Sequence, residues 1–208
     1  MATPEQIVSF ADDAPPAGAS ALVPGQVQGR DIVVVDPDPA WPDHFAALEA
    51  RVRGALGPRV LGLDHIGSTS VPGLAAKPII DLDLVIADPA DEDAYVPALE
   101  AAGFVLRIRE PWWEEHRMLR ASDPAANLHV FGPDSPVPWR DRVFRDHLRR
   151  NAADRDLYAE AKRRSAAAST AAGEDVMEYN ARKEPVIRAV FGRAFAAAGL
   201  PVATEAES

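Results

Sequence analysis

The spacing of hydrophobic residues predicts a chain that combines helices and strands. Between Pro42 and Gly57, apolar side chains recur every three or four residues, the period of a helix that buries one face. These side chains are Phe45, Leu48, Val52 and Leu56. Short apolar or β-branched runs predict strands over residues 32–35, 59–66, 78–86, 104–108, 116–120 and 127–131, the last two joined by a turn at Asp123-Pro124.

Helical spacing returns over residues 89–102, where Gly103 ends the helix, and again from Trp139 onward. Gly173 separates two of the C-terminal helices, and we expect Pro185 to break or kink the second. Residues 1–30 show no sustained period apart from a short helix near residues 4–10, so we expect an irregular arm. The pattern predicts one domain over residues 31–196 and a flexible tail over residues 197–208.

Composition narrows the class of protein. The chain has 208 residues, 47% of them hydrophobic, which suits one domain with a sizeable core. It has no cysteine, which excludes disulfides, thiolate metal sites and thiol nucleophiles and favours the cytoplasm. We find neither a secretion signal nor an apolar run of the ~20 residues that span a bilayer, so we expect no membrane association.

The net charge of −10 argues against general nucleic-acid binding, because a phosphate backbone would be repelled. The charge is uneven along the chain. Residues 138–193 carry 13 Lys or Arg against 9 Asp or Glu, or +4, which leaves −14 for the remainder. The C-terminal helices are therefore the part better suited to an anionic group, although exposed arginines on solvated helices would give the same count.

The turn from Gly67 to Ser70 and the strand that follows it carry the chemistry. Gly67 allows a tight bend, and the hydroxyls of Ser68, Thr69 and Ser70, with the backbone N–H groups around them, suit phosphate oxygens. The strand after the turn carries Asp81 and Asp83, which leave the same face about 7 Å apart and can share a divalent cation. The alternatives are a turn that only connects elements and a sheet face whose aspartates are solvated.

Other candidates each have a structural alternative. Lys77 is either a phosphate ligand or a solvated loop charge, and Arg117 either binds a phosphate or pairs with a neighbouring glutamate. Lys183 lies one helical turn after Tyr179, so this pair either reaches the site or faces solvent. His65 either orients the turn or packs in the core, and the adjacent tryptophans at 112 and 113 either stack on a base or cap the core.

Together these segments resemble the GrpB family of small bacterial proteins, part of the nucleotidyltransferase fold superfamily. The likeness covers residues 31–192 and is most specific in the string His-Ile-Gly-Ser-Thr-Ser-Val-Pro-Gly-Leu-Ala-Ala-Lys-Pro from residue 65 to residue 78. It implies an α+β fold with a mixed sheet, flanking helices and a C-terminal helical segment. In active members of the superfamily the turn holds a nucleoside triphosphate and acidic residues hold Mg²⁺, which assigns Gly67 and Ser68 to the phosphates and Asp81 and Asp83 to the metal.

The chain departs from that superfamily at the third carboxylate, which active members supply from a later strand. The corresponding strand here offers Asn127 and His129. His129 is then a metal ligand or a general base, or a hydrogen-bonded structural residue. Loss of one acid would reduce the number of ions the site can hold.

Two functions remain for comparison with the structure. The first is a nucleotidyltransferase that uses Mg²⁺ or Mn²⁺, with Asp81, Asp83 and His129 as catalytic residues. The second is a non-catalytic module that binds a nucleotide or another phosphorylated small molecule, near coenzyme A metabolism, because relatives occur joined to dephospho-coenzyme A kinase. The sequence carries no signal for the nucleotide, the acceptor or the oligomeric state.

Overall fold

A five-stranded mixed sheet organises the computed structural model, which describes residues 2–10, 15–27 and 32–201. The strands are β1 (Gly62–Ile66), β2 (Ile80–Val85), β3 (Phe104–Glu110), β4 (His116–Ser122) and β5 (Ala125–Phe131). Their order across the sheet is β1-β2-β5-β4-β3, with β2 and β5 parallel and the other neighbours antiparallel. The mixed sheet predicted from the sequence is confirmed.

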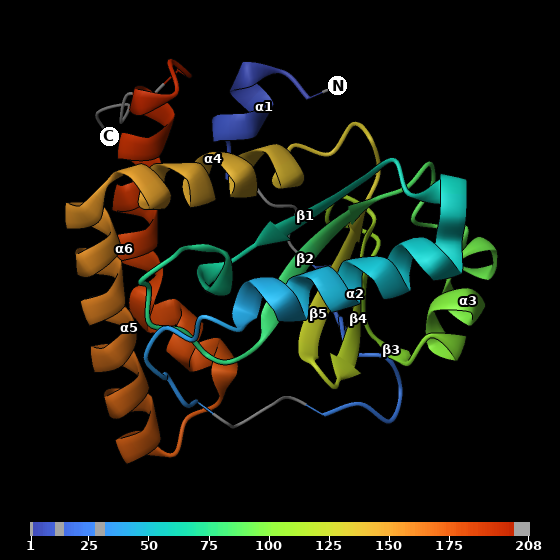
Figure 1. The fold of residues 1–208 in the computed structure, drawn as a ribbon, viewed down its shortest axis with the longest axis horizontal. Helices are drawn as coiled ribbons and strands as arrows, with labels where there is room; N and C mark the ends of the chain where they lie inside the picture. The colour runs from blue at the N-terminus through green and yellow to red at the C-terminus, as the bar shows by residue number, and fades with distance from the viewer. Residues whose placement is uncertain (1, 11–14, 28–31, 202–208) are drawn as a thin grey trace.

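Helices surround this sheet on both faces and at one end (Figure 1). They are α1 (Pro4–Val8), α2 (Trp41–Leu56), α3 (Val96–Ala101), α4 (Val137–Arg150), α5 (Ala152–Ala172) and α6 (Val176–Ala197). In Figure 1, α2 and α3 lie in front of the sheet, α4 runs beside β1, and α5 and α6 stand side by side at one end. No helix among the described residues is both long and apolar enough to cross a membrane.

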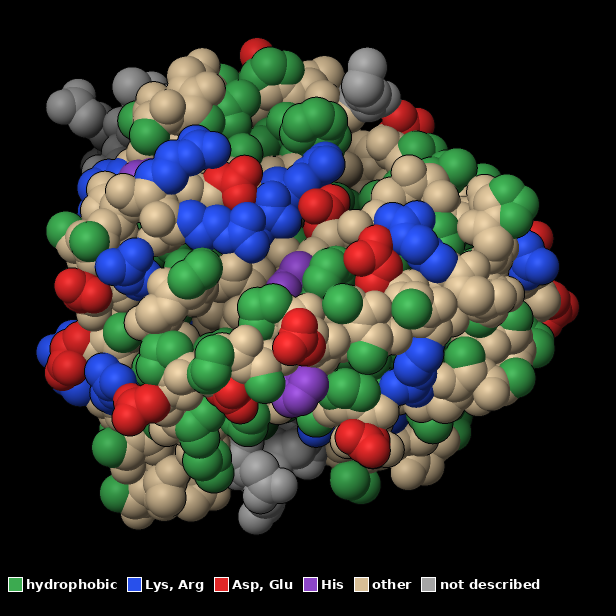
Figure 2. Space-filling model, viewed as in Figure 1, with side chains coloured by type: hydrophobic (Ala, Val, Ile, Leu, Met, Phe, Trp, Pro, Cys, Tyr) green, Lys and Arg blue, Asp and Glu red, His purple; other side chains and the backbone are tan. Residues whose placement is uncertain are grey.

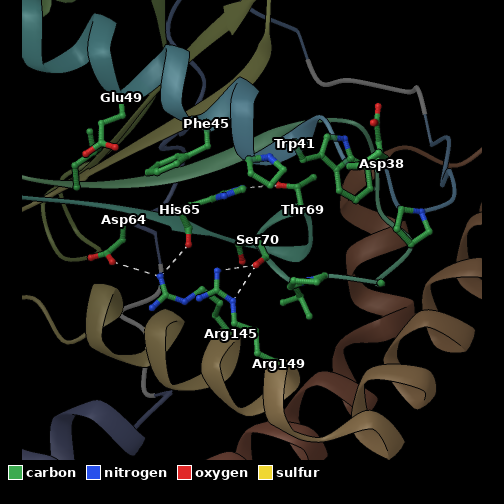
Figure 3. A pocket seen from close by; sticks show the side chains of 17 residues that line it. Asp38, Trp41, Phe45, Glu49, Asp64, His65, Thr69, Ser70, Arg145 and Arg149 are labelled. Carbon is green, nitrogen blue, oxygen red and sulfur yellow. Dashed lines mark hydrogen bonds and ion pairs between the residues drawn. The ribbon is translucent and has the colours of Figure 1, made fainter.

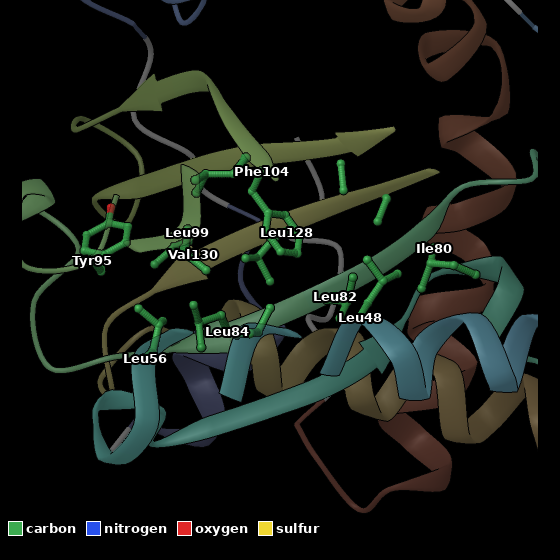
Figure 4. Packing of buried hydrophobic residues seen from close by; sticks show 14 of the residues in the cluster. Leu48, Leu56, Ile80, Leu82, Leu84, Tyr95, Leu99, Phe104, Leu128 and Val130 are labelled. Atoms are coloured by element: carbon green, nitrogen blue, oxygen red, sulfur yellow. The ribbon is translucent and has the colours of Figure 1, made fainter. Parts of the chain in front are cut away.

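The face of the sheet under α2 and α3 forms the main core (Figure 4). Alternate residues of β2 point into it, and the side chains of Ile80, Leu82 and Leu84 are at most 1% exposed. Leu48 of α2 and Leu99 of α3 cover them and are fully buried. Burial of such side chains, worth about 1.5–3 kcal/mol each, stabilises the sheet and the two helices together.

Three predicted elements differ in the structure. Residues 32–35 form no strand, because only Val35 pairs, through a single bridge to Ala76. The helix expected over residues 89–102 is a 3-10 turn at Glu92–Ala94 followed by α3, which begins beside Pro97, a residue suited to the first turn. Helix α6 continues through Pro185, so of the predicted break or kink the break does not occur.

The N-terminal residues pack on the domain at two places. Helix α1 lies against α4, where Nε of Arg140 donates to the carbonyl of Ile7 at 3.0 Å. Further along, the N–H of Val23 donates to the carbonyl of Arg107, so the arm lies along the edge strand β3. The other parts of the expected arm, residues 11–14 and 28–31, and residues 202–208 of the expected tail lie outside the described residues.

Candidate functional site

The second face of the sheet is polar, and strand register places the predicted residues side by side there. Asp81 lies next to Asn127 and Asp83 next to His129 across the parallel pair β2 and β5. The side-chain nitrogen of Asn127 donates to Oδ1 of Asp81 at 2.9 Å. On the other side of β2, Asp64 of β1 pairs with Asp83. The sheet therefore brings three carboxylates, an amide and an imidazole onto one face.

Gly67 allows the turn to approach this face closely. Its φ is 68° and its ψ is −171°, a conformation that residues with a side chain rarely adopt. A Cβ atom at this position would lie 2.5 Å from Oδ2 of Asp81, well inside van der Waals contact. We predicted Gly67 from the phosphate-binding pattern. The structure gives a further reason for a glycine at this position, because a side chain here would collide with Asp81.

The hydroxyls of the turn divide between two sides. Ser68 faces the polar site and lies within hydrogen-bonding reach of the Tyr158 hydroxyl. Thr69 also borders the site, and its Oγ lies 3.0 Å from Nε2 of His65. Ser70 instead donates to the carbonyl of Gly67 and faces the opposite side of the turn. Of the three predicted hydroxyls, the structure brings Ser68 and Thr69 to the site and leaves Ser70 out.

Three lysines converge beside the turn in a cavity of about 250 Å³. They are Lys77 before β2, Lys162 on α5 and Lys183 on α6, and the chain contains no other lysine. Asp81 and Tyr179 line the same cavity. The structure therefore places Lys183 beside the turn, and it adds Lys162, which we did not predict.

The lysines are close enough to perturb one another. Burial lowers the pKa of each amino group, and neighbouring lysines lower it further for Lys162, to about 6, and for Lys183, to about 8. The Nζ atoms of Lys77 and Lys183 lie 5.5 and 4.5 Å from the ring centre of Tyr179. Nζ of Lys162 is buried without a hydrogen-bond partner among the described residues. An anion in this cavity would supply the missing acceptor.

Asp141 of α4 adds a fourth carboxylate to this face, beside Asp83. The two groups are within hydrogen-bonding reach, so they can share one proton. Burial raises the pKa of Asp83 well above its usual value, and Asp141 raises it further. Burial also raises the pKa of Asp141 to about 6, although Arg140 opposes this shift. Helix α4 thus brings a carboxylate to the polar face of the sheet.

The chemistry of these acids fits a hard divalent cation. Both carboxylate oxygens of Asp83 are buried and accept no hydrogen bond from an N–H or hydroxyl group of the described residues. Burial also raises the pKa of Asp81, despite the opposing effects of Asn127 and the lysines. Among the described residues, no three acidic or histidine side chains are already arranged as a complete ligand set. The donors suit Mg²⁺ or Mn²⁺, but they are not preassembled around one point.

A chain of hydrogen bonds leads to His129 from the far edge of the sheet. Nδ1 of His116 lies 2.7 Å from Oε2 of Glu110, and Nε2 of His116 lies 2.9 Å from Nδ1 of His129. Burial lowers the pKa of His116, and burial with the neighbouring His116 lowers the pKa of His129 to about 3. When Glu110 accepts a hydrogen bond from Nδ1–H of neutral His116, Nε2 of His116 accepts one from Nδ1–H of His129, whose Nε2 then carries no proton.

Arg117 is not part of the site. It pairs with Val130 in the sheet register and therefore points to the core face, away from the aspartates. Its Nε donates to Oε1 of Glu92 at 2.7 Å, and its Nη1 lies 3.4 Å from Oε2 of Glu115. The structural alternative, a salt bridge to neighbouring glutamates, accounts for this arginine.

Sequence reasoning missed Asp141 and Lys162 for different reasons. Asp141 belongs to a strongly basic helical segment, and nothing in the local pattern shows that it faces β2. Lys162 could have been identified from the sequence. Only three of the 22 Lys and Arg residues are lysines, and the other two lysines were already candidates for the site.

Comparisons with known proteins give a consistent picture. The family model described as GrpB protein matches residues 31–193. A UPF0157 protein of Halalkalibacterium halodurans is 46% identical over 163 residues, which cover 78% of this chain and 82% of that protein. The solved structure of the conserved protein GrpB from Enterococcus faecalis superimposes with a TM-score of 0.66 at 25% identity, covering 78% of this chain and 99% of that one.

A longer relative shares the same region. The dephospho-CoA kinase of Mycolicibacterium paratuberculosis is 30% identical over 219 residues, which cover 92% of this chain. The match covers 51% of that kinase, so the chain spans about half of its length.

Proposed function

The chain belongs to the GrpB family, and we propose that it binds a nucleoside triphosphate with Mg²⁺ or Mn²⁺ and transfers a nucleotidyl group to an acceptor. The resemblance to nucleotidyltransferases supports this reaction through the turn at Gly67 and the aspartates of β2. We expect the protein to act in the cytoplasm, as its cysteine-free sequence suggests.

The observation that carries this proposal is the convergence of every lysine of the chain on one cavity. Burial, and after it the neighbouring lysines, lower the pKa of Lys162 and Lys183, so a bound anion would favour the charged form of both amino groups. A triphosphate carries enough charge to pair with all three lysines. Ser68, at the rim of the same cavity, would donate to a phosphate oxygen.

The acidic and histidine residues supply the remaining roles. Asp81 and Asp83, with Asp141 nearby, would hold a divalent cation, which would neutralise phosphate charge. In the tautomer in which Nδ1 of His129 donates to His116, Nε2 of His129 is free to accept the proton of an attacking hydroxyl. Asn127 holds Asp81 in place through its hydrogen bond.

Thermal unfolding and calorimetry with ATP, GTP, CTP or UTP, each with and without Mg²⁺ or Mn²⁺, test the binding step. We expect one or more nucleotides to raise the melting temperature of the wild type, because a ligand that binds only the folded state stabilises it. Lys162→Met should weaken that binding about 10- to 100-fold, the effect of losing a hydrogen bond from a charged group. The variant should fold normally, since it removes a buried amino group that has no hydrogen-bond partner among the described residues.

Arg163→Met is the matched control. Arg163 follows Lys162 directly, but its side chain is 51% exposed and pairs with Asp36 at the surface. Its replacement also removes one positive charge and should leave nucleotide affinity unchanged. Equal losses in both variants, or no nucleotide that stabilises the wild type, would contradict the proposal.

A second candidate is a binding module without transfer chemistry. It is supported by the kinase relative, in which a region similar to this chain makes up about half of the protein. Under this hypothesis the cavity binds a phosphorylated compound such as dephospho-coenzyme A, and no pyrophosphate is released from a nucleoside triphosphate. Calorimetry with dephospho-coenzyme A, together with a pyrophosphate assay, distinguishes the two functions.

A further inference from the structure

A second and larger cavity, of about 670 Å³, lies on the other side of the turn. It is bounded by α2, by α4 and by the edge strand β1 between them (Figure 3). Thr69 lines both this cavity and the lysine cavity, so only the turn separates them. Its volume falls in the range of sites for small organic molecules.

One wall of this cavity is positively charged. Arg142, Arg145 and Arg149 of α4 share two carboxylates, those of Asp64 and Asp146, at distances of 2.8 to 3.7 Å. Of these five residues Arg145, Arg149 and Asp64 line the cavity, so this wall carries one positive charge in excess. Figure 2 shows blue side chains, which are arginines on this lysine-free helix, gathered over α4 along the rim of the hollow between this helix and α2.

Arg149 is the member of this group best placed to meet a ligand. Its Nε and Nη2 donate to the carbonyl of Ser70, which holds the guanidinium against the turn. Its only carboxylate contact among the described residues is Asp146 at 3.7 Å, and Asp146 is closer to Arg145, at 2.8 Å. The side chain remains 40% exposed.

The opposite wall is apolar and aromatic. Trp41 and Phe45 of α2 face the arginines across the cavity, and the ring of Phe45 stacks on His65 at 4.7 Å. Burial lowers the pKa of His65 to about 4, so this ring is neutral and adds no charge. Two acidic residues, Asp38 and Glu49, also line the cavity; Glu49 pairs with Arg53, and Asp38 accepts a hydrogen bond from the N–H of Ala40.

We infer that this cavity binds an organic anion, a small molecule whose flat apolar part lies against Phe45 and Trp41 and whose carboxylate or phosphate meets Arg149. Asp141, Arg145 and Arg149 follow one another at intervals of one helical turn on α4, so the cavity adjoins the carboxylate cluster. This position suits the acceptor of the transfer reaction. That assignment rests on the proposed function, whereas the inference that an organic anion binds in this cavity does not.

The probe for this site is 8-anilinonaphthalene-1-sulfonate, which carries apolar rings and one anionic group. Its neutral analogue N-phenyl-1-naphthylamine has the same rings without the sulfonate. In fluorescence titrations we expect saturable binding of the sulfonate to the folded wild type. Arg149→Gln should weaken sulfonate binding about tenfold, as loss of a charged hydrogen bond does, and should not change binding of the neutral analogue.

Two further variants locate the site. Phe45→Leu should weaken both probes, because it removes the stacking surface that they share. Arg150→Gln, a change of the same charge at the next residue, should affect neither probe, since Arg150 does not line the cavity. Equal sulfonate affinity in the wild type and Arg149→Gln, or an equal loss in Arg150→Gln, would overturn the assignment.

The nucleotide experiment separates this inference from the proposed function. Lys162→Met should leave sulfonate binding unchanged, and Arg149→Gln should leave nucleotide-induced stabilisation unchanged. If nucleotide binding fails for every protein while sulfonate binding follows Arg149, the organic-anion site stands and only its role as the acceptor site is lost.

Discussion

The two faces of strand β2 serve opposite purposes. On one face, Ile80, Leu82 and Leu84 are buried under α2 and α3 and stabilise the fold. On the other face, burial raises the pKa of Asp81 and Asp83, which shows that their charged forms are disfavoured there. The apolar face of β2 therefore stabilises the folded protein, and the polar face destabilises it. Such a loss of stability is typical of a site for binding or catalysis.

The largest expected difference between the two faces is in packing. Leu82→Ala should lower the free energy of unfolding by about 2–5 kcal/mol, because it leaves a cavity in a fully buried core. Val85→Ala, on the polar face of the same strand and only partly buried, should cost about 1 kcal/mol. Urea denaturation measures both values. Equal losses would show that the two faces contribute equally to stability.

A smaller effect is expected where the polar face meets the turn. Gly67→Ala should destabilise the protein by about 2–3 kcal/mol, because alanine is strained at this φ and ψ and its Cβ displaces Asp81. The displacement should also weaken nucleotide and metal binding, since the hydrogen bond from Asn127 to Asp81 depends on that position.

Gly173→Ala is the matched control for this change. Gly173 has a similar φ, 69°, but it lies in the left-handed helical region and has no atom within 4 Å of the added Cβ. Its replacement should cost about 1 kcal/mol and leave ligand binding unchanged. If both glycine variants lose the same stability and bind nucleotide equally, close approach to Asp81 is not what requires Gly67.

The sequence was most informative where local pattern and side-chain chemistry agree. Alternation along β2 predicted that Asp81 and Asp83 share a face, and the register with Asn127 and His129 confirms that β5 lies beside them. Strand spacing also predicted every strand of the sheet, although residues 32–35 were wrongly added, because a β-branched run gives no information about whether a partner strand is available.

The remaining part of the site depends on tertiary packing. Asp141 comes from a helix whose position over β1 cannot be read from helical spacing, and Lys162 reaches the cavity only because α5 packs beside α6. Arg117 was a plausible phosphate ligand by residue type, but the strand register turns it to the core face. Residue chemistry thus suggested the candidates, and the packing of helices against the sheet decided which of them meet.

The smallest expected effect, and the most specific, concerns Asp141. Burial raises its pKa in the folded protein from 3.8 to about 6, so the folded state binds more protons than the unfolded state between these values. Stability is therefore lost as the pH rises from about 4 to about 6.

Asp141→Asn removes that loss. Without metal, in the presence of EDTA, it should stabilise the protein by about 1 kcal/mol at pH 7.5 and have no effect near pH 4, where Asp141 is already protonated. Asp146→Asn, on the same helix, is the control with the opposite sign. Burial raises the pKa of Asp146, but the hydrogen bond from Arg145 outweighs this and holds the pKa below its usual value, so that variant should be less stable at neutral pH. Thermal unfolding across this pH range measures both variants, and a stabilisation by Asp141→Asn that does not change with pH would show that ionisation of Asp141 is not its cause.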